Sequence, residues 1–282
     1  MNKYQVYRKD FLSGLLGLLL VAPLLNAAGD ASFTRKEDVI YGRKFGMALT
    51  MDVFNPAQPN GLGVIFIVSA GWVSSKEAVW PQLYKPLLNH GYTVFAVMHG
   101  AQPKFQVPEI IQDLHRAVRY IRFNAAKFGI DPARLGVCGG SAGGHLSLIL
   151  ATQGGDGDAK AKDPVDRQSS AIQCAACFFP PTDFLNYGGP HTNVVGQGTL
   201  AFLKAAFGPV PSDPEAARKF GESISPIYSI TSNLPPTLII HGNADTLVPI
   251  QQALSFRDKA AAMGDTVKVI TKEGLGHGWK NF

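Results

Sequence analysis

The run Gly139-Gly140-Ser141-Ala142-Gly143 contains the residue of this chain best suited to act as a nucleophile. The pattern G-x-S-x-G is typical of a serine on a sharp turn between a strand and a helix. Side chains two positions before and after the serine would clash at such a turn, and glycine at both positions removes the clash. The helix that follows directs backbone N–H groups at developing negative charge. A glycine-rich loop and a phosphate cradle are the alternatives, and the absence of a following lysine argues against a Walker loop.

A nucleophilic serine needs a base, and the base needs an acid to hold its tautomer. Of seven histidines, His277 stands in a glycine-rich loop after the last predicted strand, in Gly-Leu-Gly-His-Gly. Asp245 follows the preceding predicted strand, in the run from His241 to Pro249. The carboxyl ends of parallel strands share one edge of a sheet, where ligands bind in such folds. We therefore predict His277 as base and Asp245 as acid, with Asp183 as the competing acid.

Short apolar segments alternate with amphipathic ones along the chain. Two strands are predicted at 38–43 and 47–54, and buried strands at 62–68, 92–98, 134–138, 172–179, 237–241 and 266–271. Helices are predicted at 81–90, from 108 to about 121, at 142–152 and at 249–263. This alternation predicts an α/β fold with a mostly parallel sheet covered by helices on both faces.

Residues 29–282 are predicted to form one domain, since neither an internal repeat nor a linker is visible. Two segments break the alternation. Residues 153–169 are polar, and about 183–232 is rich in glycine and proline. The second is long enough to form a cap insertion over the strand ends.

Residues 1–28 have the layout of an export signal peptide. Lys3, Arg8 and Lys9 precede an apolar run at 11–25, followed by Ala27 and Ala28. The apolar run is shorter than the roughly 20 residues that span a bilayer, so no permanent membrane anchor is expected. We predict an exported protein, periplasmic or secreted, with Sec and twin-arginine routes both open.

The remaining charges and cysteines indicate no metal, redox or nucleic-acid site. The net charge of +5 is mild and evenly spread, which argues against nucleic-acid binding. Cys174 and Cys177 fall within a predicted strand and are interpreted as buried apolar side chains. An acidic loop lacks the spacing of a calcium hand and is interpreted as solvated surface; it contains Asp156, Asp158, Asp163 and Asp166.

With these motifs the chain resembles the α/β-hydrolase superfamily, and within it small exported esterases related to hormone-sensitive lipase and to acetylxylan and feruloyl esterases. The resemblance runs from about residue 39 to 279 and implies an acyl-enzyme mechanism on small acyl or carbohydrate esters, with no cofactor. It also implies an oxyanion hole from the backbone N–H groups of Ala70, Gly71 and Ala142.

The sequence departs from these relatives at two places. Val-Ser-Ala-Gly-Trp at 68–72 replaces their His-Gly-Gly-Gly-Trp. The sequence stops five residues after His277, where relatives continue into a closing helix. We expect either another cover for the last strand or a truncated sequence.

Two other functions fit the same residues. A serine peptidase of the prolyl-oligopeptidase type shares the constellation but usually carries a large N-terminal propeller. A non-catalytic binding protein on a hydrolase fold is the other, and the presence of Ser141, Asp245 and His277 argues against it.

Overall fold

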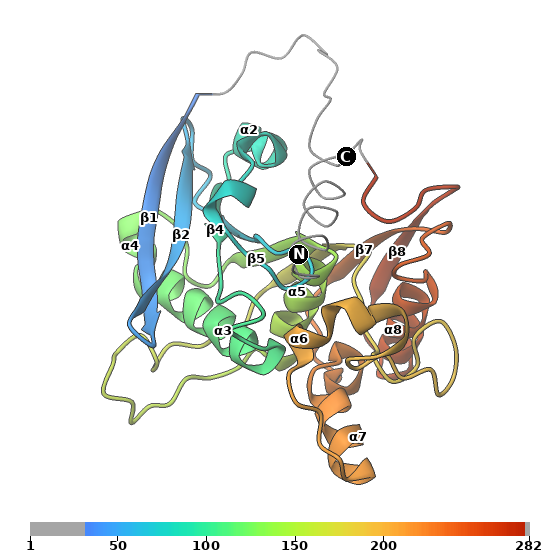
Figure 1. The fold of residues 1–282 in the computed structure, drawn as a ribbon. Coiled ribbons are helices and arrows are strands. Elements are labelled where there is room, and N and C mark those ends of the chain that lie inside the picture. Colours follow the sequence, from blue (N-terminus) through green and yellow to red (C-terminus); the bar gives the residue numbers. More distant parts are fainter. Residues whose placement is uncertain (1–31, 280–282) are drawn as a thin grey trace, which may run out of the picture.

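The computed structural model describes residues 32–279, which contain one eight-stranded sheet (Figure 1). The strands lie in the order β1-β2-β4-β3-β5-β6-β7-β8. Their bounds are Phe33–Lys44 (β1), Met47–Pro56 (β2), Gly63–Ile67 (β3), Thr93–Val97 (β4), Leu135–Gly140 (β5), Cys174–Phe178 (β6), Thr237–Gly242 (β7) and Val267–Lys272 (β8). The β1–β2 and β2–β4 pairs are antiparallel and the others are parallel. The predicted α/β fold with a mostly parallel sheet is confirmed.

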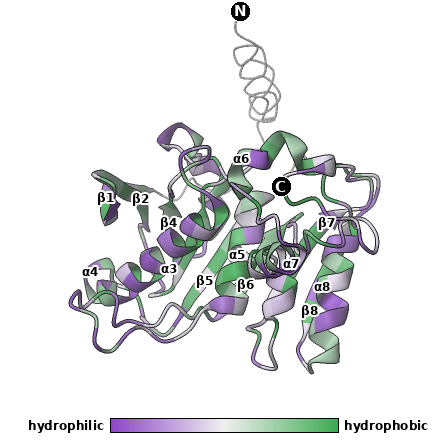
Figure 2. Cartoon of the chain, turned by 60° about the horizontal axis from the view of Figure 1, so that its bottom comes forward, coloured by the Kyte–Doolittle hydropathy of each residue, from purple (hydrophilic) through white to green (hydrophobic). Residues whose placement is uncertain are grey.

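Helices α2 (Lys85–Asn89), α3 (Val107–Phe123), α4 (Ala125–Phe128), α5 (Ala142–Gln153) and α8 (Gln251–Ala262) connect the strands. α3 begins with a capping box between Gln106 and Glu109, and its predicted apolar face is buried. α5 is buried over its first nine residues, because it lies directly on the sheet, and is among the more hydrophobic elements in Figure 2. The helix predicted at 81–90 is shorter: a 3-10 turn at Pro81–Leu83 precedes α2.

The segment at 183–232 carries only short helices. They are a 3-10 helix at Gly198–Leu203, α6 (Lys204–Phe207), α7 (Pro214–Ser223) and a 3-10 helix at Pro226–Ser229. Within this segment, Phe184 and Phe207 pack against Trp72, with ring centroids 5.8 and 5.4 Å from it. The segment thus contacts the loop after β3, while its role as a cap stays a prediction.

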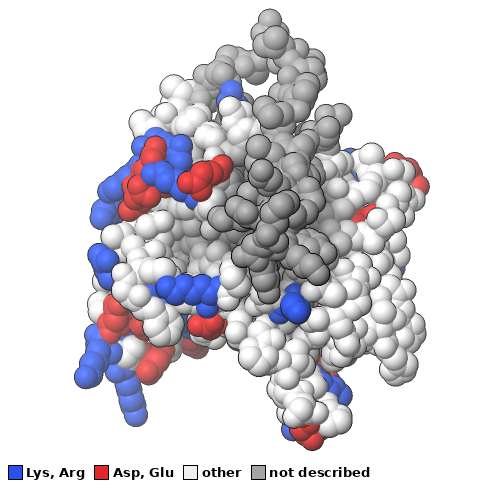
Figure 3. Space-filling model, viewed as in Figure 1, with Lys and Arg blue, Asp and Glu red and all other residues white. Residues whose placement is uncertain are grey.

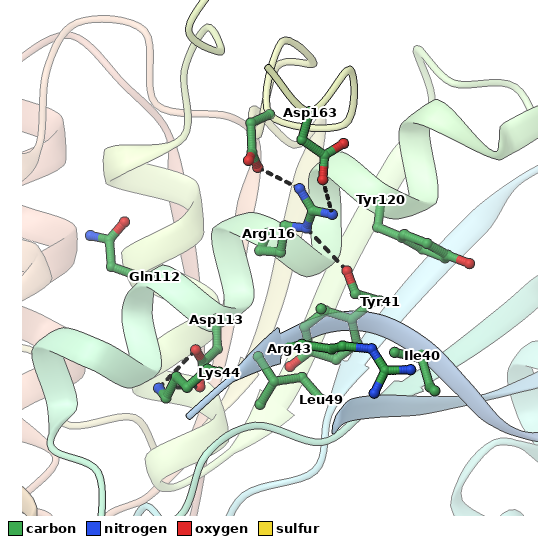
Figure 4. Close-up of a pocket in the computed structure, with 12 residues that line it drawn as sticks. Ile40, Tyr41, Arg43, Lys44, Leu49, Gln112, Asp113, Arg116, Tyr120 and Asp163 are labelled. Carbon is green, nitrogen blue, oxygen red and sulfur yellow. Dashed lines mark hydrogen bonds and ion pairs between the residues drawn. The ribbon is translucent and has the colours of Figure 1, made fainter. Parts of the chain in front are cut away.

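Ion pairs fasten the sheet edge and the acidic loop to α3. Arg116 donates to Asp163 and Asp166, at 2.7 Å each, beside a hollow of about 560 Å³ between β1 and α3 (Figure 4). Figure 3 shows that charged side chains on this face of the molecule gather on the side of β1 and α3. The acidic loop is solvated surface, as predicted, since the Asp163 and Asp166 side chains are 45% and 42% exposed even though both pair with Arg116.

A second ion pair lies in the same hollow. Lys44, near the end of β1, donates to Asp113 of α3 at 2.8 Å. The Asp113 carboxylate also accepts the backbone N–H of Gly100, at 3.0 Å, in the loop after β4. One carboxylate therefore connects three elements that are distant in sequence.

The two cysteines of β6 differ in exposure. Cys177 is buried, as predicted, whereas Cys174 is exposed. Successive side chains of a strand point to opposite faces, so residues three apart lie on opposite sides of the sheet. The sequence shows the strand but not how each of its faces is covered.

Residues 1–28, the predicted signal peptide, lie outside the described residues, as do the last three residues of the chain. Within 32–279, no helix is long and apolar enough to cross a bilayer.

Candidate active site

The turn between β5 and α5 has the geometry expected of the glycine-serine motif. β5 ends at Gly140 and α5 begins at Ala142, so Ser141 alone forms the corner. Its backbone lies at φ 54° and ψ −122°, which is strained for a residue with a side chain. Hydrogen bonds hold the strained residue from both sides: its N–H donates to Phe178 O, and its carbonyl accepts from His145 N–H, both at 2.9 Å.

The glycines at 139 and 143 are required by close backbone approach. A Cβ on Gly139 would lie 2.7 Å from the backbone of Gly143, and one on Gly143 would lie 2.8 Å from the carbonyl of Ile67. Backbone atoms cannot move aside as a flexible side chain can. The predicted clash is confirmed by these distances: it occurs across the turn at Gly139 and against β3 at Gly143.

Gly139→Ala is expected to lower the free energy of unfolding by about 1–3 kcal/mol, the usual cost of overpacking. Urea unfolding followed by circular dichroism measures it. Gly155→Ala is the matched control, because its Cβ would meet no heavy atom within 4 Å. Equal stability of the two variants would contradict the close approach at the elbow.

The structure brings Ser141, His277 and Asp245 together in one hydrogen-bonded chain. His277 Nε2 lies 2.9 Å from Ser141 Oγ, and His277 Nδ1 lies 2.8 Å from Asp245 Oδ2. A carboxylate can only accept, so Nδ1 carries the hydrogen and Nε2 accepts from the serine hydroxyl. This is the tautomer in which a histidine can remove a proton from the serine.

The surroundings of Asp245 keep its carboxylate ionised. Its side chain is fully buried, and Oδ1 accepts the backbone N–H groups of Leu247 at 3.0 Å and Val248 at 2.8 Å. His241 Nε2 lies 3.5 Å from Oδ2. Burial by itself raises the pKa of Asp245, but the hydrogen bonds from His241, His277 and the Val248 amide outweigh it and hold the pKa well below its usual value.

Asp183, the competing acid, is engaged elsewhere. Its carboxylate accepts from the backbone N–H groups of Leu185 and Asn186, from the Asn186 amide and from the Tyr228 hydroxyl. These bonds form a turn at the start of the 183–232 segment. Both ring nitrogens of His277 are already occupied by Ser141 and Asp245.

The loop after β3 differs from the expected oxyanion arrangement at one residue. Ala70 and Val73 exchange two backbone hydrogen bonds of 3.0 Å, so the Ala70 N–H is occupied and cannot stabilise an oxyanion. Gly71 and Trp72 form the tip of this hairpin, at φ 55° and 59°, and Gln102 holds both of their carbonyls. The assignment of Ala70 as a donor is therefore wrong.

Three other N–H groups remain as candidate donors. Within residues 32–279, those of Gly71, Trp72 and Ala142 have no hydrogen-bond acceptor. Trp72 was missed because a positive φ at tryptophan is rare and leaves no signal in the sequence.

An aromatic wall covers one side of His277, and the sequence does not predict the part that Phe179 plays in it. The Phe179 ring lies 4.7 Å from the imidazole, centroid to centroid, and Trp279 packs on Phe179 at 5.0 Å. Phe179 has φ 40°, so the strained residue directly after β6 aims its ring at the site. The wall shields the imidazole, whose side chain is 20% exposed.

A comparison with protein-family profiles matches most of this chain. The BD-FAE family profile matches residues 51–260, which include both the elbow and Asp245. This chain belongs to the BD-FAE family. His277 lies beyond the matched range.

Among curated relatives, Esterase LipC of Mycobacterium tuberculosis is 27% identical over 271 residues, 91% of this chain and 63% of LipC. The probable carboxylic ester hydrolase LipM of the same organism is 27% identical over 79% of this chain and 51% of its own length. The chain thus spans about half to just under two thirds of these relatives.

Two solved structures match over more of their own length. A truncated carbohydrate esterase from gut microbiota has a TM-score of 0.75 at 26% identity, over 89% of this chain and 91% of that one. An acetyl ester-xyloside bifunctional hydrolase from Caldicellulosiruptor lactoaceticus has a TM-score of 0.67 at 26% identity, over 82% and 80%.

Proposed function

We propose that this protein is a serine carboxylic ester hydrolase acting through an acyl-enzyme on Ser141. The observation that carries the proposal is the chain of two hydrogen bonds from Ser141 Oγ through His277 to Asp245. It supplies a nucleophile, a base in the correct tautomer and a buried anion that stabilises the base once it is protonated. The esterases among the relatives support the same reaction class.

In the acylation step, Ser141 Oγ attacks the ester carbonyl carbon and its proton passes to His277 Nε2. The carbonyl oxygen becomes an oxyanion, and the amides at the tip of the Gly71–Trp72 hairpin and at Ala142 are the candidate donors to it. The intermediate collapses by expelling the alcohol, which takes the proton from His277. Asp245 keeps the imidazole oriented and stabilises its positive charge.

In the deacylation step, water replaces the alcohol. His277 Nε2 removes a proton from that water as it attacks the acyl carbon, and then returns the proton to Ser141 Oγ as the carboxylic acid leaves. No step of this cycle is an oxidation or a reduction. His277 ends the cycle in the protonation state in which it began.

The substrate class that we propose is a small acyl ester on a carbohydrate. Support comes from the two solved relatives whose names include a carbohydrate esterase and an acetyl ester hydrolase, each 26% identical to this chain. The aromatic wall of Phe179 and Trp279, which are 5% and 8% exposed, gives the reacting centre an apolar side.

A panel of esters and amides tests the proposal. Purified protein is offered 4-nitrophenyl acetate, acetylated xylan, a feruloyl sugar ester and peptide amides, with Ser141→Ala as the blank. Faster cleavage of esters than amides is expected, because an alkoxide is a better leaving group than an amide anion, so expulsion of the alcohol depends less on protonation by His277. Faster amide cleavage would favour the peptidase, and no turnover of any member above the blank would favour a binding protein. Release of acetate from xylan, measured against release of ferulate, separates the two carbohydrate esters.

A further inference from the structure

The tip of the hairpin after β3 is held in a conformation that its own sequence does not favour. Gly71 adopts a positive φ freely, but Trp72 has a bulky side chain and also lies at φ 59°. A left-handed backbone is unfavourable for a residue with a Cβ, because the Cβ lies too close to the following carbonyl oxygen. Surrounding contacts must therefore hold Trp72 in place.

Gln102 holds the Trp72 carbonyl, and the other contacts are made by the Trp72 side chain, which is 1% exposed. The rings of Phe184 and Phe207, both from the 183–232 segment, pack on the indole. The indole Nε1–H donates to His145 Nδ1, at 3.2 Å, and the two rings meet edge to face. Among residues 32–279, this is the only hydrogen bond that the Trp72 side chain makes.

His145 can accept this bond in only one of its forms. Its Nε2 lies 2.7 Å from the carbonyl of Ile224, which can only accept, so Nε2 carries the hydrogen and Nδ1 is left as an acceptor. The side chain is fully buried, and burial lowers the pKa of His145 to about 4. The imidazole is neutral at pH 7, with both nitrogens engaged.

His145 also lies on the helix that carries the other half of the site. It is one turn after Ser141 on α5, and its backbone N–H donates to the Ser141 carbonyl at 2.9 Å. The same residue thus contacts the elbow through its backbone and the hairpin through its side chain. Ile224, at the end of α7, adds a link to the 183–232 segment.

We propose that His145 is a positioning residue: by fixing the indole of Trp72, it holds the Gly71–Trp72 amides in register with the Ala142 amide across the oxyanion site. The inference rests on the proposed ester hydrolysis. His145 touches no substrate and takes no proton. It acts only through the geometry of the hairpin, so its loss should slow the chemical step more than it weakens substrate binding.

The test is steady-state hydrolysis of 4-nitrophenyl acetate by His145→Leu, His145→Asn and Trp72→Phe. A misplacement of about 1 Å in a catalytic group can cost about 100-fold. We expect His145→Leu and Trp72→Phe each to lower kcat by about 30- to 100-fold with KM within about threefold of wild type. His145→Asn should recover part of this loss, because its amide oxygen can accept the indole N–H in place of Nδ1.

The double variant Trp72→Phe with His145→Leu isolates the hydrogen bond. If the two residues act through one contact, the double variant is expected to be no slower than the slower single variant. Multiplied losses would overturn the proposal, as would a wild-type kcat in His145→Leu.

His115→Leu is the matched control for loss of a buried histidine. His115 is also buried and also has a hydrogen-bond partner, Ser170 Oγ at 3.0 Å, but it lies on α3 away from the hairpin. The His115→Leu variant should have a lower melting temperature and, below that temperature, an unchanged kcat. An equal loss of kcat in His115→Leu would mean that the effect at His145 is only structural.

Failure of this inference is distinguishable from failure of the proposed function. If wild-type protein hydrolyses no ester above the Ser141→Ala blank, the proposed function fails. If wild-type protein is active and His145→Leu keeps its kcat, only the positioning role fails.

Discussion

Ser141→Ala is expected to reduce kcat/KM for 4-nitrophenyl acetate by about 10⁴-fold or more, because no other group can form the acyl-enzyme. The fold should be retained, since alanine removes one oxygen and keeps the Cβ at the elbow. Ester hydrolysis by purified variant and wild type, with matched circular dichroism spectra, measures the effect.

Covalent labelling gives a second readout of the same residue. A fluorophosphonate should add one group to the wild-type chain, on the peptide that contains Ser141, and none to Ser141→Ala. Ser223→Ala, at an exposed serine of α7 that bonds the Phe220 carbonyl, is the control and should label as wild type does. Turnover by Ser141→Ala within tenfold of wild type would rule out this serine as the nucleophile.

Asp245→Asn is expected to lower kcat by about 10⁴-fold with little change in KM. An asparagine can turn its NH₂ toward His277 Nδ1, which forces the hydrogen onto Nε2. In that tautomer, His277 cannot accept the Ser141 proton. The measurement is steady-state ester hydrolysis at pH 7, together with the melting temperature.

Asp183→Asn is the matched control, because it makes the same isosteric change in the competing acid. Asparagine keeps an oxygen that can accept from Leu185 and Asn186 N–H, so the local turn is expected to survive and activity to stay within about threefold of wild type. The opposite pattern, an active Asp245→Asn and an inactive Asp183→Asn, would exchange the two assignments.

The sequence predicts Ser141, Asp245 and His277 well because each follows a strand. Parallel strands bring their carboxyl ends to one edge, so residues 104 and 136 positions away from Ser141 still meet there. Only local patterns are needed to find them: apolar runs, glycines and one polar residue at the end of each run.

The Gly71–Trp72 hairpin after β3 shows a feature that local sequence patterns cannot predict. Whether Ala70 or Trp72 presents its N–H depends on the left-handed backbone of Trp72, and the contacts that hold it come from His145, Phe184 and Phe207. Those residues lie 73 or more positions away in sequence. The exposure of Cys174 was mispredicted for a related reason, since it depends on which elements cover each sheet face.

The Asp113 carboxylate has a consequence for how the molecule opens. It accepts from Lys44 at the edge strand and from the amide of Gly100, two residues before Gln102, which holds the carbonyls of Gly71 and Trp72. Detaching the outer β1–β2 hairpin would therefore also loosen the support of the Gly71–Trp72 hairpin after β3. Hydrogen exchange should report both regions as one cooperative unit. The backbone amides of β1, the edge strand opposite β8, should then exchange with the same free energy of opening as those of the Gly71–Trp72 hairpin.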